Sequence, residues 1–171
     1  KAGAKKIVAV LPYLPYSRQD KSFYGRYTGS IDLIGKFFKT CGVDEVVSFD
    51  LHKPSIKLDF AVKLKEISLI DFWAKFIKSN ISHKSLCSVN EKICIVSPDK
   101  GHLDVVRKIA KQLGSDFAYI EKERVGKDRS VAYNLIAKDL NGASTEFPLA
   151  TKKVFLIDDI IDTGTTMFNA C

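Results

Sequence analysis

Residues 154–166, V-F-L-I-D-D-I-I-D-T-G-T-T, decide the fold class. The first four residues are apolar, which predicts a buried strand. Two carboxylates, Asp158 and Asp159, follow at once, and a short polar loop then leads into a predicted helix. A buried strand that empties into a polar loop and a helix is typical of α/β proteins with a parallel sheet.

The polar loop has the composition of a sugar-phosphate site. Its residues are Asp162, Thr163, Gly164, Thr165 and Thr166. Backbone N–H groups at such a loop, together with threonine hydroxyls, favour an anion. Ionised carboxylates only accept hydrogen bonds, so Asp158 and Asp159 suit hydroxyl groups instead. Ribose 5-phosphate would satisfy both halves, while an acidic turn with a threonine N-cap is the structural alternative.

The rest of the chain repeats the order of strand, polar tip and helix. Strands are predicted at residues 7–11, 46–49, 93–96, 117–120 and 154–157. Helices are predicted at 69–77, at 103–113 and from residue 30 to a stop at Gly42. Residues 133–150 are ambiguous. The pattern predicts an α/β fold with a mainly parallel sheet flanked by helices.

Several polar side chains follow predicted strand ends, where ligands bind in parallel α/β sheets. Outside residues 154–166 they are Arg18, Gln19, His52, Asp99, Lys122 and Arg124. An imidazole and a carboxylate, from His52 and Asp99, suit Mg²⁺, which is held by few protein ligands plus phosphate oxygens. Taken alone, His52 equally fits an exposed histidine and Asp99 a helix N-cap.

Lys122 and Arg124 alternate with glutamates just after a predicted strand. A solvated run of charges explains them if they are considered alone. Beside a metal ion and phosphates, the two cations would instead neutralise the charge that develops during phosphoryl transfer.

Length, charge and cysteine usage restrict the function classes. The 171 residues fit one domain, or one domain and part of another, and the net charge of +7 comes from dispersed lysines. No nucleic-acid-binding signature occurs, and no apolar stretch is long enough to cross a bilayer. The four cysteines lack zinc-site spacing, and Cys41 and Cys94 are expected to be reduced core residues. With no signal peptide, we expect a cytoplasmic protein without membrane or nucleic-acid partners.

Five segments, in order, resemble motifs of the ribose-phosphate pyrophosphokinases (PRPP synthetases). They are P-Y-L-P-Y-S-R-Q-D-K at 12–21, S-F-D-L-H at 48–52, S-P-D-K-G at 97–101, K-E-R at 122–124 and D-D-I-I-D-T-G-T-T at 158–166. The resemblance implies a phosphoribosyltransferase-like three-layer fold. It also implies transfer of the diphosphoryl group of Mg-ATP to the 1-hydroxyl of ribose 5-phosphate, giving PRPP and AMP. Residues 1–171 would then be the central portion of such a protein, cut at both ends.

The resemblance also implies roles for individual segments. Residues 12–29 would form a loop that contacts ATP through Arg18 and Gln19, and His52 would serve ATP and Mg²⁺ together with Asp99. Residues 122–130 would be a flexible catalytic loop carrying Lys122 and Arg124. Residues 158–166 would be the ribose-phosphate loop, with the aspartates 158 and 159 at the hydroxyls and residues 162–166 at the phosphate. Members of this family assemble as homo-oligomers, so a dimer or hexamer is expected.

Residues 100, 102 and 165 and the segment 21–29 depart from the family pattern. His102 replaces the second glycine of S-P-D-x-G-G, where its side chain would crowd the nucleotide or point to solvent. Thr165 stands where many members have glycine. A non-catalytic homologue or fragment that binds nucleotide or a partner subunit is therefore the alternative. A phosphoribosyltransferase that joins PRPP to a base would share only the last motif.

Overall fold

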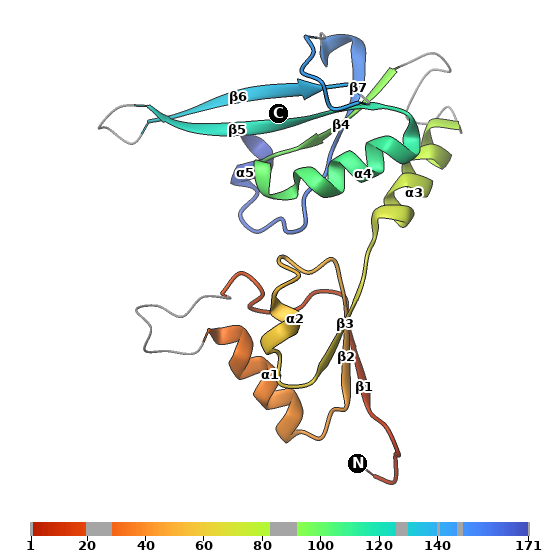
Figure 1. The fold of residues 1–171 in the computed structure, drawn as a ribbon, viewed down its shortest axis with the longest axis vertical. Coiled ribbons are helices and arrows are strands. Elements are labelled where there is room, and N and C mark those ends of the chain that lie inside the picture. The colour runs from red at the N-terminus through yellow and green to blue at the C-terminus, as the bar shows by residue number, and fades with distance from the viewer. Residues whose placement is uncertain are drawn as a thin grey trace. The chain divides into compact units, whose positions relative to one another are not determined.

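The computed structural model describes residues 2–19, 29–82, 92–125, 130–139, 141–146 and 149–170. The chain divides into two compact units, Lys1–Leu69 and Ile70–Cys171 (Figure 1). Each unit contains its own sheet, and every pairing but one among the named strands is parallel. The α/β class with mainly parallel sheets flanked by helices is therefore confirmed. Among the helices of the described residues, none combines the length and apolarity that crossing a membrane requires.

The first unit is a three-stranded parallel sheet in the order β1-β2-β3. Its elements are β1 (Val8–Leu11), α1 (Ser30–Thr40), β2 (Glu45–Phe49), α2 (Ile56–Asp59) and β3 (Lys63–Ile67). Helix α1 ends where Gly42 adopts a positive φ of 78°, and the N–H of Val43 donates to the carbonyl of Phe38 at 3.0 Å. This Schellman-type ending confirms that the helix stops at the glycine.

The second unit is a four-stranded sheet in the order β6-β5-β4-β7. Its elements are α3 (Ile70–Ser82), β4 (Lys92–Ser97), η2 (Lys100–His102), α4 (Leu103–Leu113), β5 (Asp116–Val125), β6 (Ser130–Lys138), η3 (Leu149–Thr151), β7 (Lys152–Leu156) and α5 (Thr165–Phe168). Strands β5, β4 and β7 are parallel, and β6 is antiparallel to β5. Helix α4 has the bounds that the apolar spacing predicts.

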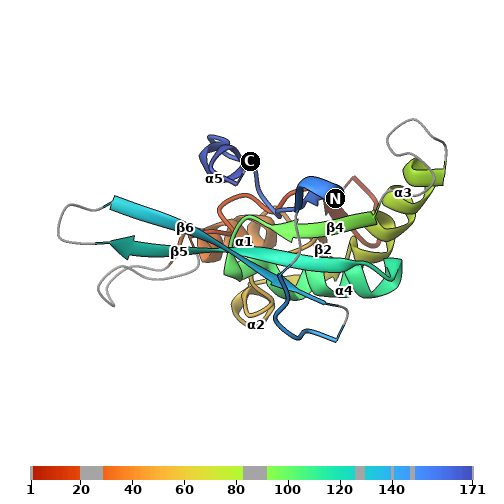
Figure 2. The same cartoon turned by 90° about the horizontal axis from the view of Figure 1, so that it is seen from above.

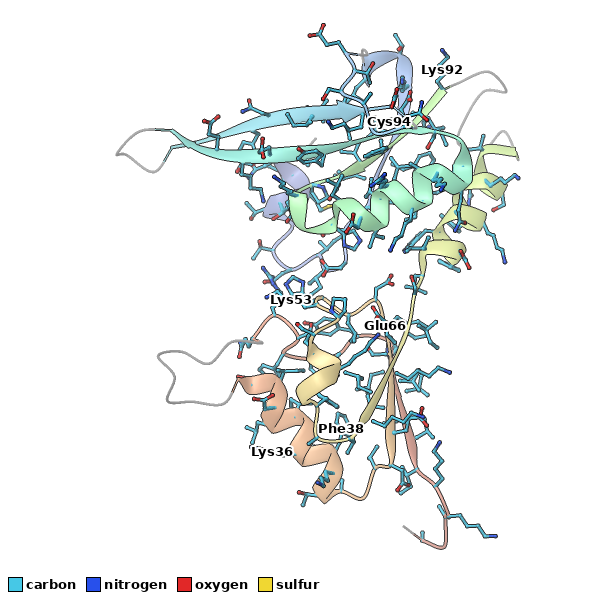
Figure 3. All side chains as sticks on the ribbon, viewed as in Figure 1. Lys36, Phe38, Lys53, Glu66, Lys92 and Cys94 are labelled. Atoms are coloured by element: carbon cyan, nitrogen blue, oxygen red, sulfur yellow. The ribbon has the colours of Figure 1, made fainter. Side chains whose placement is uncertain are left out.

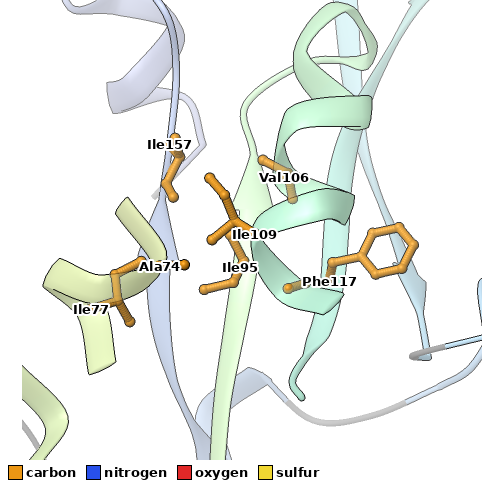
Figure 4. Close-up of a cluster of buried hydrophobic side chains, with 8 residues drawn as sticks. Ala74, Ile77, Ile95, Val106, Ile109, Phe117 and Ile157 are labelled. Carbon is orange, nitrogen blue, oxygen red and sulfur yellow. The ribbon is translucent and has the colours of Figure 1, made fainter. Parts of the chain in front are cut away.

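The core of the second unit lies between the sheet and helices α3 and α4 (Figure 4). Ile95 of β4 and Ile109 of α4 are fully buried there, and Ile157 follows β7 into the same cluster. Successive side chains of a strand point to opposite faces of the sheet. On the face opposite Ile95, Cys94 and Val96 form a smaller cluster with Ala118. This packing fixes the ends of β4 and β7, after which the polar segments begin.

Two strands and one α-helix were not predicted from the sequence, and β5 extends well beyond its predicted end. The unpredicted elements are α2, β3 and β6. Strand β5 continues past residue 120 to Val125 and pairs with β6 as a long two-stranded ribbon (Figure 1, Figure 2). The expectation that Cys41 is a core residue is wrong, because Cys41 caps α1 and is exposed. Cys94, labelled in Figure 3, is buried as expected.

Candidate functional site

The paired carboxylates lie just beyond the carboxyl end of β7. The N–H of Ile157 donates to the carbonyl of Val96 at 2.9 Å, so the pairing with β4 continues one residue past the strand. Asp158 and Asp159 follow at once and are both half-buried. Because β4 and β7 are parallel neighbours, the segment that follows β4 begins at this same edge of the sheet.

Burial is the main influence on Asp158 and raises the pKa of its carboxyl above the ordinary value. The backbone N–H of Asp159 donates to Oδ1 of Asp158 at 3.0 Å, which partly opposes this rise. The negative charges of Asp159 and Asp99 raise the pKa further. The structure thus gathers three carboxyl groups at one edge, and this concentration of negative charge suits hydroxyl donors or a cation.

The loop that follows is closed by its own threonines. Gly164 has a φ of 78°, in the left-handed region, and precedes helix α5. The hydroxyls of Thr163 and Thr165 lie 2.9 Å apart, and Thr163 Oγ1 also accepts from the N–H of Thr165 at 3.4 Å. The N-cap of α5 is Gly164, so the helix has no side-chain cap. Threonine hydroxyls and the first N–H groups of a helix are donors for an anion.

The turn after β4 is held by hydrogen bonds to Asp99. The buried Ser97 hydroxyl donates to the Asp99 carbonyl at 2.5 Å. Asp99 Oδ1 accepts from the N–H of Gly101 at 2.8 Å and so caps η2, the structural role that the sequence left open for it. A Cβ on Gly101 would lie 3.1 Å from that oxygen, so a larger residue there would require the Asp99 carboxyl to shift. Asp99 itself is half-buried and close enough to influence Asp158.

His102 belongs to this cluster, although its departure from the family pattern gave no reason to place it there. It is the N-cap residue of α4, and its side chain makes no capping hydrogen bond. One ligand atom each from His102, Asp158 and Asp159 lies within 4.8 Å of the others. The side chain is half-buried beside the carboxylates, which is the environment that the sequence alone left undecided.

Lys122 and Arg124 lie within β5, so the expected loop at 122–130 needs correction. The structure assigns residues 122–125 to β5 and residue 130 to β6, and the four residues between them lie outside the described part. The Lys122 side chain is exposed, and its residue pairs with Tyr133 of β6. Arg124 pairs with Val131, and its side chain is outside the described residues. Among the described strands, β6 alone pairs with residues 120–125 of β5, so Lys122 and Arg124 lie on a two-stranded part of the sheet.

In the first unit, Arg18 and Gln19 follow β1 on an anchored turn. Leu14 and Ser17 are buried, with 2% of each residue exposed, and the N–H of Gln19 donates to the Tyr16 carbonyl at 2.8 Å. Arg18 and Gln19 are both exposed. The remainder of the expected ATP loop, residues 20–28, lies outside the described residues.

His52 follows β2 on a turn that is tied to β3. The N–H of Leu51 donates to Glu66 Oε1 at 3.0 Å, and Glu66 pairs with Lys57 at 2.5 Å (Figure 3 labels Glu66). Asp50 has a positive φ of 31°, and its Oδ1 accepts from the N–H of Leu69 at 3.0 Å. His52 is exposed. It belongs to the first unit and Asp99 to the second, so their joint metal site stays a prediction.

Comparisons with known proteins show which proteins this chain resembles. The family model described as the phosphoribosyl transferase domain matches residues 64–171, and that of the N-terminal domain of ribose phosphate pyrophosphokinase matches residues 1–42. The ribose-phosphate pyrophosphokinase of Methanobrevibacter smithii is 34% identical over 98% of this chain and 54% of its own length. That of Saccharolobus solfataricus is 38% identical over 98% of this chain and 52% of its own length.

A solved structure shows the same likeness in three dimensions. The crystal structure of phosphoribosylpyrophosphate synthetase from Mycobacterium smegmatis matches with a TM-score of 0.73 and 32% sequence identity. The match covers 98% of this chain and 48% of that one. The chain therefore spans about half the length of the relatives that it matches.

Proposed function

Because this chain belongs to the ribose-phosphate pyrophosphokinase family, we propose that the protein makes PRPP and AMP from ATP and ribose 5-phosphate. The observation that most supports this is the edge of the second sheet, where Asp99 and the 158–166 loop follow adjacent parallel strands. Ligands bind at that edge in parallel α/β sheets. The strand order of the second unit thus supports a site at this edge of its sheet.

Ribose 5-phosphate is proposed to bind along the 158–166 loop. Asp158 and Asp159 accept hydrogen bonds from the ribose hydroxyls, because ionised carboxylates have only acceptors to offer. The backbone N–H groups and hydroxyls of residues 163–166, together with Asp162, surround the 5-phosphate. The sugar is held at both ends, which leaves its 1-hydroxyl to face the nucleotide.

ATP is proposed to approach with Mg²⁺, held by His52 and Asp99 and contacted by Arg18 and Gln19. An imidazole nitrogen and a carboxylate oxygen are a donor set that fits a divalent cation, and the negative charge around Asp99 favours one. When bound, the ion would neutralise phosphate oxygens and hold the chain of phosphates in position. Each of these residues stands on a turn with buried or hydrogen-bonded neighbours.

The proposed chemistry is an in-line displacement at the β-phosphorus. The 1-hydroxyl oxygen of the sugar forms a bond to the β-phosphorus. At the same time, the bond between the β-phosphorus and the oxygen that bridges it to the α-phosphate breaks. AMP leaves, and the hydroxyl proton is released. Lys122 and Arg124 neutralise the charge that develops on the transferred group, since positioning and electrostatics supply most catalysis of this kind.

Formation of AMP tests this function directly. Purified protein is incubated with ATP, Mg²⁺ and ribose 5-phosphate, and AMP is quantified by chromatography. We expect AMP only when all three are present. A protein that binds both substrates and forms no AMP would contradict catalysis and favour the alternative of a non-catalytic homologue that binds nucleotide or a partner subunit.

The proposal also includes a homo-oligomer, a dimer or hexamer, in the cytoplasm. Light scattering of the purified protein would test the oligomeric state.

A further inference from the structure

A cluster of three side chains with metal-binding atoms lies at the edge of the second sheet. His102 begins α4 after the turn that follows β4, while Asp158 and Asp159 follow β7. Their ligand atoms lie within 4.8 Å of one another, and all three side chains are half-buried. Strands β4 and β7 are hydrogen-bonded neighbours, so the sheet itself brings the histidine to the aspartates.

The spacing of these atoms is close to that of a metal shell. Ligands at about 2.1 Å from an ion lie at most about 4.2 Å apart. Small changes in side-chain torsion would therefore bring the three atoms onto one ion. One imidazole nitrogen with carboxylate oxygens is a donor set for borderline divalent metals such as Co²⁺, Mn²⁺ or Zn²⁺.

The supports behind the ligands are already in place. The N–H of Asp159 donates to Oδ1 of Asp158 at 3.0 Å and orients that carboxyl group. The turn that leads to His102 is fixed by the bond from the Gly101 N–H to Asp99 Oδ1 at 2.8 Å. Such contacts behind a ligand commonly change metal affinity by about 10- to 100-fold.

We propose that His102, Asp158 and Asp159 together bind one borderline divalent metal ion, at a position distinct from the Mg²⁺ pair His52 and Asp99. Half-buried carboxylates that lie side by side repel each other, and a cation shared with the imidazole removes that repulsion. Three protein ligands leave coordination positions open for water or for sugar hydroxyls. The role toward a sugar rests on the proposed function, whereas the metal site itself does not.

Titration with Co²⁺ alone, without nucleotide or sugar, tests the site. Visible absorption of the ion reports coordination by the protein, and we expect saturation at one ion per chain. His102→Gly, which restores the glycine common in the family, should weaken binding by about 10-fold or more. His102→Gln keeps the volume of the side chain, and Asp159→Asn removes a carboxylate, and both should weaken binding similarly. Circular dichroism verifies that each variant is folded.

Asp104→Asn is the matched control, since it removes an exposed carboxylate only two residues from His102. Co²⁺ affinity should be unchanged in this variant. Unchanged affinity in folded His102→Gly and His102→Gln, or loss of affinity in Asp104→Asn alone, would overturn the site. So would a wild-type protein that binds no Co²⁺. None of these results would contradict the proposed reaction, because its own test is the formation of AMP.

Discussion

Asp158 illustrates how a proposed binding loop and a stable fold make opposite demands on one residue. Its carboxyl is half-buried beside Asp159 and within the influence of Asp99. Burial and these like charges disfavour the ionised form that would accept hydrogen bonds from a sugar. The same arrangement makes the carboxylate available to a ligand that supplies donors or positive charge. Functional sites commonly reduce stability in this way.

Replacing this carboxyl should change how stability depends on pH. The pKa of Asp158 is raised from 3.8 in the folded chain, so the folded state retains a proton that the unfolded state releases as pH rises above that value. The contribution of this carboxyl to the free energy of unfolding is therefore fully present below pH 3.8. It is lost as pH rises through the pKa of the folded state. Asp158→Asn should match the wild type in acid and be more stable at neutral pH. Urea unfolding midpoints across pH measure this, and the exposed Asp104→Asn should show no such gain.

Lys122 is the residue on which the proposed chemistry depends most. Its charge matters chiefly while the diphosphoryl group is in transit, so Lys122→Ala should lower kcat by about 10²- to 10³-fold. The affinity for ribose 5-phosphate should stay near the wild-type value. Lys108→Ala, an exposed lysine of α4, is the matched control and should leave both quantities unchanged. If the variant loses sugar affinity and turnover in equal proportion, Lys122 binds the ground state instead.

At the scale of elements, α1 shows where packing overrides helix propensity. Gly35 is buried in the helix, and a Cβ there would lie 2.9 Å from the backbone nitrogen of Ala61 and 3.2 Å from the Phe60 ring. Alanine is favoured over glycine in an exposed helix by about 1 kcal/mol. Here the close backbone leaves no room for the added methyl group.

Gly35→Ala should therefore destabilise the chain. The overpacking costs about 1–3 kcal/mol, and the higher helix propensity of alanine offsets about 1 kcal/mol of that cost. The neighbouring Lys36→Ala should change the free energy of unfolding by less than about 0.5 kcal/mol, because Lys36 is exposed. Chemical denaturation of both variants measures the difference. A stabilised Gly35→Ala chain would contradict the close packing of α1 against residues 60 and 61.

The elements that the sequence predicts are those whose apolar spacing is regular. Helix α4 has three fully buried residues at helical spacing, Val106, Ile109 and Ala110, and its bounds are as predicted. Strand β3, K-L-K-E-I, is mostly charged, and its single buried residue, Leu64, gives too little apolar pattern to predict a strand. Strand β6 is stabilised by its pairing with β5, and the propensities of its own residues do not predict that pairing.

At the scale of the whole molecule, the sequence predicts which polar residues follow the strands. The structure determines which of these residues lie close together. Asp99 and the 158–166 loop come together because β4 pairs with β7, an order that the sequence does not state. His102 joins them because η2 turns the chain at Asp99 before α4 begins. No spacing rule within the sequence joins residues 102 and 158. The residues of the first unit stay assigned by motif alone.

The binding of ribose 5-phosphate to this chain tests the central claim most directly, because the proposed sugar site lies within the second unit. Isothermal titration should show saturable binding of one sugar phosphate per chain. Asp159→Asn should weaken it by about 10- to 100-fold, the value of a hydrogen bond to a charged group, with Asp104→Asn unchanged as the control. Failure of the wild-type chain to bind, or undiminished affinity in Asp159→Asn, would contradict the assignment of the 158–166 loop.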